Sequence, residues 1–186
     1  AKRFMIVDAV YGYNTISVMA YAKQNSMYLI FADKDNAAAV SENLRTIGAE
    51  EVLLYGYTDK EVKESLDAKT LQYNEINLGD KFDDNMQITD MYFKKDPSKK
   101  QALLSDGNGI ESTIAAGDDP IILISPVIPT AVYDYIKQKV SSGQIKVAMI
   151  VDQEYAQTAY NLKTNINNEL GSKSLSVLVK FGQSTA

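Results

Sequence analysis

An acidic, glycine-rich turn is the first segment whose residue types could bind a ligand. Asp106-Gly107-Asn108-Gly109 follows an apolar run and precedes a helix of small residues. In an open parallel sheet such a turn lies where backbone N–H groups can face an anion. Glu111 and Ser112 follow where a dinucleotide fingerprint needs another glycine. The segment therefore reads first as a tight structural turn. As a ligand loop, its candidate binding residues are Asp106, Gly107 and Asn108.

Tyrosines are concentrated in two other turns. Tyr11 and Tyr13 lie in the turn from Asp8 to Asn14, and Tyr55 and Tyr57 lie on either side of Gly56. Aromatic rings on loops suit sugar stacking or a protein interface, and they also suit plain packing. Tyr13 and Tyr57 complete the set of candidate ligand-binding residues.

Acidic side chains are the remaining candidates for chemistry. Asp33 and Asp35 resemble the acidic turn of Toprim-type sites that hold Mg²⁺. Together with Asp8 they could form the metal site of a phosphotransfer enzyme. The simpler interpretation is that they cap the N-terminus of the helix at 37–47. The acids of segment 80–90 suit a first helical turn because of the helix dipole. We therefore expect no catalytic residue, no metal site and no cofactor.

Composition excludes several classes of protein. The chain has no His and no Cys, which excludes imidazole bases, thiol nucleophiles, disulfides and metal sites with His or Cys ligands. A formal net charge of −5 makes nucleic acid an unsuitable partner. No apolar run reaches transmembrane length. Because the chain starts at Ala1 without Met, we expect a leader or larger parent protein to have been removed.

The elements that would position these residues occur twice. The run from Phe4 to Asp8 matches the run from Ala102 to Asp106, and two later apolar runs match at a similar offset. A repeat of this length predicts two copies of one α/β unit, residues 1–95 and 98–186, which are either separate or packed as a single unit. The charged segment Lys94–Lys100 is the expected boundary.

Apolar runs alternate with helical periodicity throughout the chain, which predicts an α/β fold with parallel sheet in a three-layer sandwich, Rossmann-like or Toprim-like. Thr15 and Thr58 are expected to cap helices, Thr58 in a capping box with Glu61, and Gly48 to end one. The expected strands are 4–7, 27–31, 52–55, 71–78, 102–105, 121–125, 146–151 and 175–181. The expected helices are 15–23, 37–47, one from Thr58, 82–93, 110–116, 130–140 and 155–170.

The second copy combines a turn at Asp106, a helix with Ala115-Ala116, a strand from Pro120 to Pro126, and a helix start at Ile128-Pro129. In these features it resembles the cell wall binding repeat 2 family of bacterial and archaeal surface proteins. Leu78-Gly79-Asp80-Lys81-Phe82 resembles a further element of the family, with Lys for its Arg and Phe for its Tyr. The resemblance implies a surface module with a Rossmann-like or Toprim-like sheet.

The leading hypothesis is a non-enzymatic, secreted module at the cell surface. It would attach to a cell-envelope polymer or to a neighbouring protein in a surface layer (S-layer), either alone or as a homo-oligomer. The alternatives are an intracellular domain that binds a small ligand or nucleotide at the Asp106 turn, and the Mg²⁺-dependent phosphotransfer enzyme. The turns at the carboxyl ends of the strands are expected to form the recognition edge, since helix N-termini expose unpaired N–H groups there.

Overall fold

A computed structural model describes residues 2–180, apart from the side chains of residues 110–112. Strands and helices alternate, and the strands form two four-stranded sheets that are parallel throughout. The first half contains β1 (Arg3–Val7), α1 (Gly12–Gln24), β2 (Met27–Phe31), α2 (Ala37–Ile47), β3 (Glu51–Tyr55), α3 (Lys60–Ala68), β4 (Asn74–Ile76) and α4 (Lys81–Lys95). The second contains β5 (Gln101–Ser105), α5 (Ile110–Ala116), β6 (Ile121–Leu123), α6 (Thr130–Ser141), β7 (Val147–Ile150), a short 3₁₀ turn (Gln153–Tyr155), α7 (Ala156–Leu170) and β8 (Ser176–Val179).

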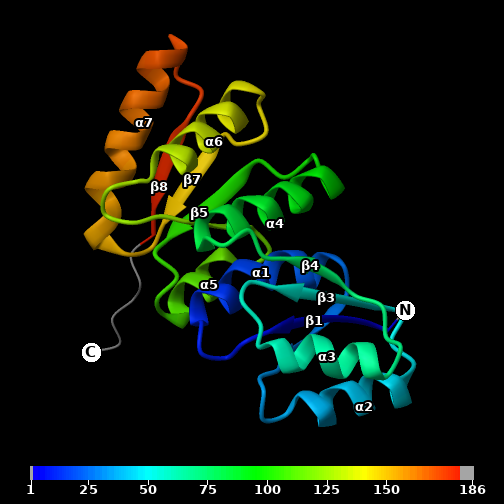
Figure 1. The fold of residues 1–186 in the computed structure, drawn as a ribbon. Helices are drawn as coiled ribbons and strands as arrows, with labels where there is room; N and C mark the ends of the chain where they lie inside the picture. Colours follow the sequence, from blue (N-terminus) through cyan, green and yellow to red (C-terminus); the bar gives the residue numbers. More distant parts are fainter. Residues whose placement is uncertain (1, 181–186) are drawn as a thin grey trace.

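The two sheets have the same connectivity. The strand order is β2-β1-β3-β4 in the first sheet and β6-β5-β7-β8 in the second, so each strand has a counterpart at the same place (Figure 1). This confirms the predicted fold class, a parallel α/β architecture built from two similar halves. Within the described residues, none of the helices combines the length and the apolar character needed to cross a membrane.

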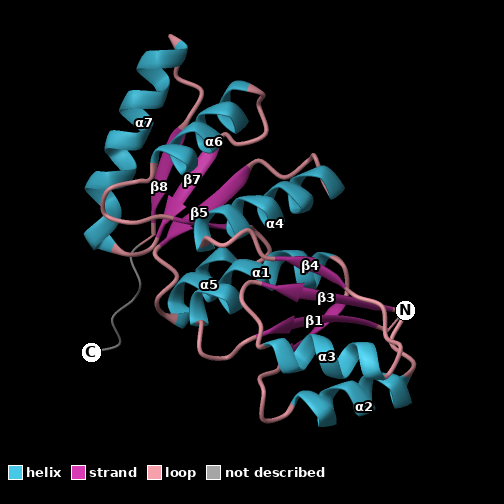
Figure 2. Cartoon of the chain, viewed as in Figure 1, coloured by secondary structure: helices cyan, strands magenta, loops and turns pink. Residues whose placement is uncertain are grey.

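Helices cover both faces of the first sheet. Along β1, Phe4 and Ile6 pack with α2 and α3, while Met5 and Val7 pack with α1 and α4. Burial on both faces explains why the strand is a continuous apolar run. Figure 2 shows α2 and α3 on one side of the sheet and α1 and α4 on the other.

The second sheet is covered differently on its two faces. Side chains of α6 and α7, such as Ile136 and Leu162, pack on one face with Leu104. On the other face Leu103 and Met149 pack with α5 and with Ile16 from the first half.

Helices α1 and α4 also join the two halves. Ala20, Tyr92 and Phe93 enter the core of the second sheet. The buried Asn85 of α4 then pairs with edge strand β6: its Nδ2 donates to the Ile121 carbonyl at 2.7 Å, and its Oδ1 accepts from Leu123 N at 2.9 Å. One side-chain amide therefore satisfies backbone groups that a neighbouring strand would otherwise pair.

Two predicted helix caps are wrong. Thr15 lies inside α1, which begins at Gly12 because Tyr11 N already bonds back to the Asp8 carbonyl. Thr58 precedes Asp59, whose backbone is still extended, so α3 begins at Lys60 and no capping box forms. Gly48 ends α2 in the left-handed conformation as predicted, with φ 76°.

Strand boundaries differ modestly from the prediction. β4 is restricted to Asn74–Ile76, because Leu71 and Tyr73 pack against the core before pairing with β3 begins. β8 ends at Val179, and Phe181, the predicted end of that strand, lies outside the described residues.

Candidate functional site

Two of the five candidate binding residues line one cavity, at the carboxyl edge of the first sheet. Strands β1, β3 and β4 all end there, so the segments that follow them converge. The cavity has a volume of ≈ 300 Å³. Its lining residues come from the start of α1, the loop after β3, and the loop and first turn of α4: Tyr13, Asn14, Tyr57, Asn77, Gly79, Asp80, Lys81 and Asp84. We call it the aromatic–lysine cavity.

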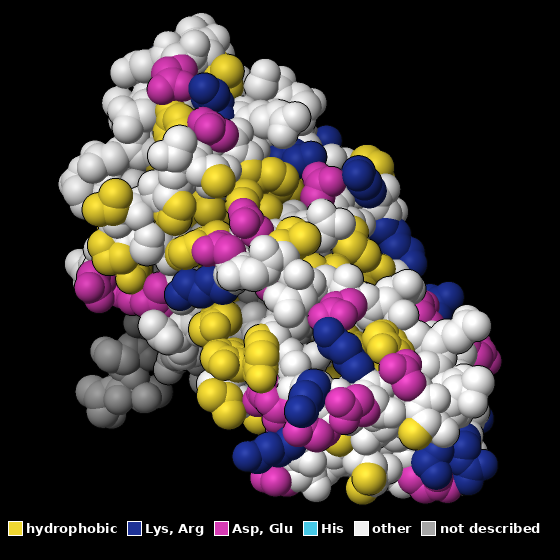
Figure 3. Space-filling model, viewed as in Figure 1, with side chains coloured by type: hydrophobic (Ala, Val, Ile, Leu, Met, Phe, Trp, Pro, Cys, Tyr) yellow, Lys and Arg dark blue, Asp and Glu magenta, His cyan; other side chains and the backbone are white. Residues whose placement is uncertain are grey.

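Two tyrosine rings and one ammonium group line this cavity, and the ring of Tyr11 lies against both tyrosines. The Tyr11 ring centroid lies 5.7 Å from that of Tyr13 and 6.0 Å from that of Tyr57, so Tyr11 connects the other two rings. The Lys81 Nζ lies 5.0 Å from the centroid of the Tyr13 ring, within cation–π range. Tyr57 is half exposed. Hydrophobic side chains gather on the surface over the loops that follow β1 and β3 (Figure 3).

A buried carboxylate shapes the floor of the cavity. Asp84 accepts a hydrogen bond from Leu78 N at 2.6 Å and so holds the loop between β4 and α4 in place. Burial raises the pKa of Asp84; the Leu78 hydrogen bond lowers it, and the nearby Asp80 and Asp83 raise it again. Asp80 is the N-cap of α4, because its side chain accepts from Phe82 N and Asp83 N.

The raised pKa of Asp84 predicts a dependence of stability on pH. An acid whose pKa is higher in the folded state binds its proton more tightly when folded, so it favours folding below its unfolded pKa and loses that contribution as pH rises through the folded pKa. We expect Asp84→Asn to raise the Tm at pH 7 relative to wild type, and the gain to shrink near pH 3. Thermal melts at both pH values measure it. The exposed Asp134→Asn serves as control, and an equal gain at the two pH values would contradict the argument.

The Asp106 turn lies beside the aromatic–lysine cavity and not in its lining. The Asp106 carboxylate accepts from the Tyr155 hydroxyl at 3.1 Å and from Asn108 N at 2.8 Å. Gly107 has φ 81°, and a Cβ there would lie 2.7 Å from the Cβ of Tyr13. The turn thus packs against the start of α1. Ligand binding by Asp106, Gly107 and Asn108 stays a prediction.

The carboxylates of the hypothetical Mg²⁺ site accept hydrogen bonds from backbone N–H groups of neighbouring residues in the chain. Asp33 Oδ1 accepts from Asp35 N at 2.8 Å and from Asn36 N at 3.1 Å, and Asp8 Oδ1 accepts from Val10 N at 3.0 Å. The residue at the N-cap of α2 is Asn36, so the predicted N-cap role is wrong for Asp35, one residue earlier, and for Asp33, three residues earlier. Among the side chains that the structure describes, no group of three or more His, Cys, Asp or Glu could hold a metal ion.

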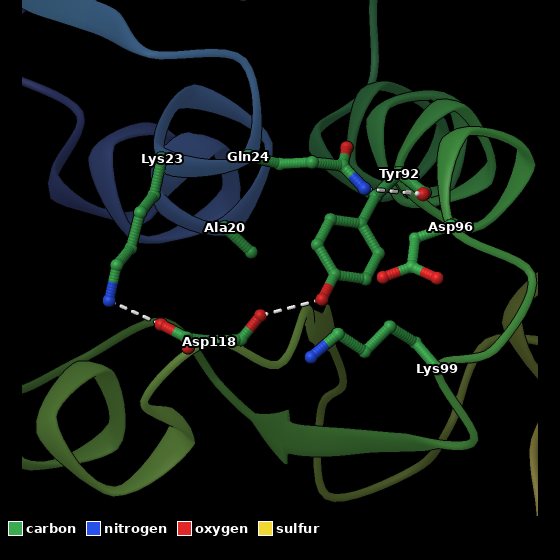
Figure 4. A pocket seen from close by; sticks show the side chains of 7 residues that line it. All are labelled: Ala20, Lys23, Gln24, Tyr92, Asp96, Lys99 and Asp118. Carbon is green, nitrogen blue, oxygen red and sulfur yellow. Dashed lines mark hydrogen bonds and ion pairs between the residues drawn. The ribbon is translucent and has the colours of Figure 1, made fainter.

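A second cavity, of ≈ 280 Å³, lies between the halves. Its residues bind mainly to each other: the Tyr92 hydroxyl donates to the Asp118 carbonyl at 2.7 Å, Lys23 pairs with the Asp118 carboxylate, and Gln24 Nε2 donates to the Tyr92 carbonyl at 3.0 Å (Figure 4). These contacts tie α1 and α4 to the loop before β6. The residues around this cavity therefore hold the two halves together.

Sequence reasoning missed most of the residues that surround the tyrosines. Asn14, Asn77 and Asp84 contribute to the cavity from three separate segments. Lys81 had one indication, the likeness of its segment to an element of the cell wall binding repeat 2 family.

Comparison with known proteins supports the fold. Cwp6 from Clostridium difficile matches 99% of this chain with a TM-score of 0.72 at 15% identity, and the match covers 28% of Cwp6. The chain has a fold similar to that of Cwp6. Aspartate transcarbamoylase from Trypanosoma cruzi and LsrB from Clostridium saccharobutylicum match with TM-scores of 0.32 and 0.33, both at 12% identity, covering 99% and 97% of this chain and 58% and 71% of theirs. Scores that low support no inference. No protein-family model matches the chain, and no curated protein matches it in sequence.

Proposed function

We propose that this chain is a non-enzymatic extracellular module that attaches to a cell-envelope polymer through the aromatic–lysine cavity. The observation that carries the proposal is the convergence of Tyr13, Tyr57 and Lys81 at one edge of the first sheet. The fold similarity to Cwp6, a cell wall protein, supports a place at the cell surface. Lateral assembly in a surface layer and a homo-oligomeric state belong to the same proposal.

The chemistry of the cavity suits one unit of a polymer. Tyrosine rings offer apolar faces to sugar C–H groups, and their hydroxyls can meet polar partners. Asn14 and Asn77 add amide groups that both donate and accept hydrogen bonds. The Lys81 ammonium can pair with a phosphate or carboxylate substituent as a point charge.

Binding to isolated cell walls tests the proposal. We expect the chain to sediment with purified walls of Clostridium difficile, the source of Cwp6. Tyr57→Ala should weaken binding by roughly tenfold, since an aromatic contact contributes about 1 kcal/mol or more beyond buried area. Lys81→Gln should weaken it as well, and more so at low salt, where an exposed charge is less screened.

Tyr28→Ala is the matched control, because Tyr28 is a similarly exposed tyrosine on β2. Its wall binding should match that of wild type, and melts should show that every variant is folded. Equal losses in Tyr28→Ala and Tyr57→Ala, or no sedimentation of the wild-type chain, would refute the proposal.

A further inference from the structure

A groove between α6 and α7 has a lining unlike that of the other cavities described above. It has a volume of ≈ 280 Å³. The residues that line it are all uncharged: Pro126, Ile128, Thr130, Tyr133, Thr158, Asn161, Leu162 and Asn165. Over the first turns of these two helices, the surface shows mainly hydrophobic and uncharged polar side chains (Figure 3).

Three polar residues of the groove lie on one stripe of α7. Thr158, Asn161 and Asn165 are spaced three and four residues apart, so they project from the same side of the helix toward α6. A seam between two packed helices ordinarily carries apolar side chains that interdigitate. Asn161 and Asn165 instead remain exposed in the groove. Packing of the two helices therefore does not explain this stripe.

The equivalent seam in the first half is more tightly packed. There α2 and α3 pack more closely against each other than α6 and α7 do. The Asp59 carboxylate accepts from Lys34 N at 2.7 Å and draws the loop before α2 onto the start of α3. In the second half the corresponding hydrogen bond is longer: Thr158 Oγ1 donates to the Pro126 carbonyl at 3.4 Å. The two halves therefore differ at this seam, which is more tightly packed in the first half.

The groove has a defined far end and an aromatic wall. Downstream, Lys137 and Glu169 form an ion pair of 2.9 Å that joins α6 to α7. The Lys137 Nζ lies 5.8 Å from the centroid of the Tyr133 ring and so covers that ring at this end. Upstream, Pro126 and Ile128 in the loop after β6 supply apolar contact area.

We propose that this groove binds a neutral sugar unit. Amide and hydroxyl groups match the paired donors and acceptors of sugar hydroxyls, while Tyr133, Ile128 and Leu162 offer apolar faces to the ring. The lining carries no charge, and Lys137 and Glu169 at the far end already pair with each other, so a charged ligand would lose water without gaining a free countercharge. Binding sites of this kind combine apolar walls with a few placed polar groups. The inference rests on the proposed function only in taking the sugar to be part of an envelope polymer.

Titration of the isotope-labelled chain with soluble sugars tests the inference by NMR. The probes are N-acetylglucosamine and glucose, with glucose 6-phosphate as a charged counterpart. Neutral sugars should shift the amide signals of α6 and α7 around the groove, and glucose 6-phosphate should bind at least several-fold more weakly. Asn161→Ala combined with Asn165→Ala should weaken binding by tenfold or more.

Asn168→Ala is the matched control, since Asn168 is an exposed asparagine of α7 outside the groove. It should leave the affinity unchanged. Tyr57→Ala should also leave it unchanged while reducing wall binding, which separates this site from the aromatic–lysine cavity. The inference is overturned by absent shifts at millimolar sugar, by stronger binding of glucose 6-phosphate, or by preference for the uncharged peptide acetyl-Ala-Pro-Leu-amide.

Discussion

Replacing Asn85 by alanine is expected to lower the free energy of unfolding by about 3 kcal/mol. The change removes both hydrogen bonds to β6 and leaves the Ile121 carbonyl and Leu123 N buried without their partner. Each buried backbone group left unsatisfied costs about 1–3 kcal/mol. For a chain of this size the Tm should fall by roughly 6–12 °C, which calorimetry or a denaturant titration measures.

Asn85→Asp provides a sharper variant of the same experiment. Aspartate keeps the acceptor for Leu123 N, loses the donor to the Ile121 carbonyl and buries a charge, so at pH 7 it should be at least as damaging as alanine. Its deficit should shrink in acid, where the carboxyl group regains a proton that it can donate. The exposed Asn168→Ala should change stability by less than about 0.5 kcal/mol. A comparable loss in Asn168→Ala, or none in Asn85→Ala, would contradict the bridging role.

Replacing Gly107 by alanine is expected to be as costly, for a different reason. A Cβ at this position would lie 2.7 Å from the Cβ of Tyr13 and 3.1 Å from Cδ2 of Leu123, so backbone or core must shift. The residue also has φ 81°, which costs an L-residue about 1–2 kcal/mol. Overpacking typically adds about 1–3 kcal/mol, so we expect a total of about 2–5 kcal/mol.

Gly143→Ala separates the two costs. Gly143 has a similar φ of 77°, and a Cβ there would meet nothing within 4 Å. Its variant should therefore lose only the contribution from backbone conformation. Denaturant titrations of the two variants give the difference, and equal losses would mean that Gly107 is needed for its backbone conformation and not for the close approach to Tyr13.

The architecture could be predicted because buried strands leave a strong pattern. The apolar runs at Phe4–Val7 and Ala102–Leu104 are unbroken because helices cover both faces of each sheet. Matching runs at a similar offset then indicate the same connectivity twice.

Helix starts were harder to predict because distant residues determine them. Asp59 is fixed by a hydrogen bond to Lys34 N, and this contact lies outside any local capping rule. Likewise, nothing in the local sequence distinguishes Asn85 from a solvated helix residue. Its partners on β6 are 36 and 38 residues away, so only the tertiary structure reveals its role.

Only part of the candidate site could be predicted, because the rest depends on tertiary packing between the two sheets. Tyr13 and Tyr57 follow strands whose ends share an edge, so topology alone places them together. Asp106 and Gly107 follow β5 in the other sheet, and the position of that sheet against α1 depends on side-chain packing. The groove of α7 has a local signature, the spacing of Thr158, Asn161 and Asn165, that is visible in the sequence but meaningful only once α6 is seen opposite.

The two halves depend on each other unequally. The first sheet is covered on both faces by its own helices, all of which precede residue 96. The second sheet borrows Ile16, Ala20, Tyr92 and Phe93 for its cores and Asn85 for its edge. A ribosome delivers these surfaces before it delivers the strands that need them, since synthesis runs from the amino terminus. The parts of α1 and α4 that complete the second sheet are therefore already synthesised when its strands emerge.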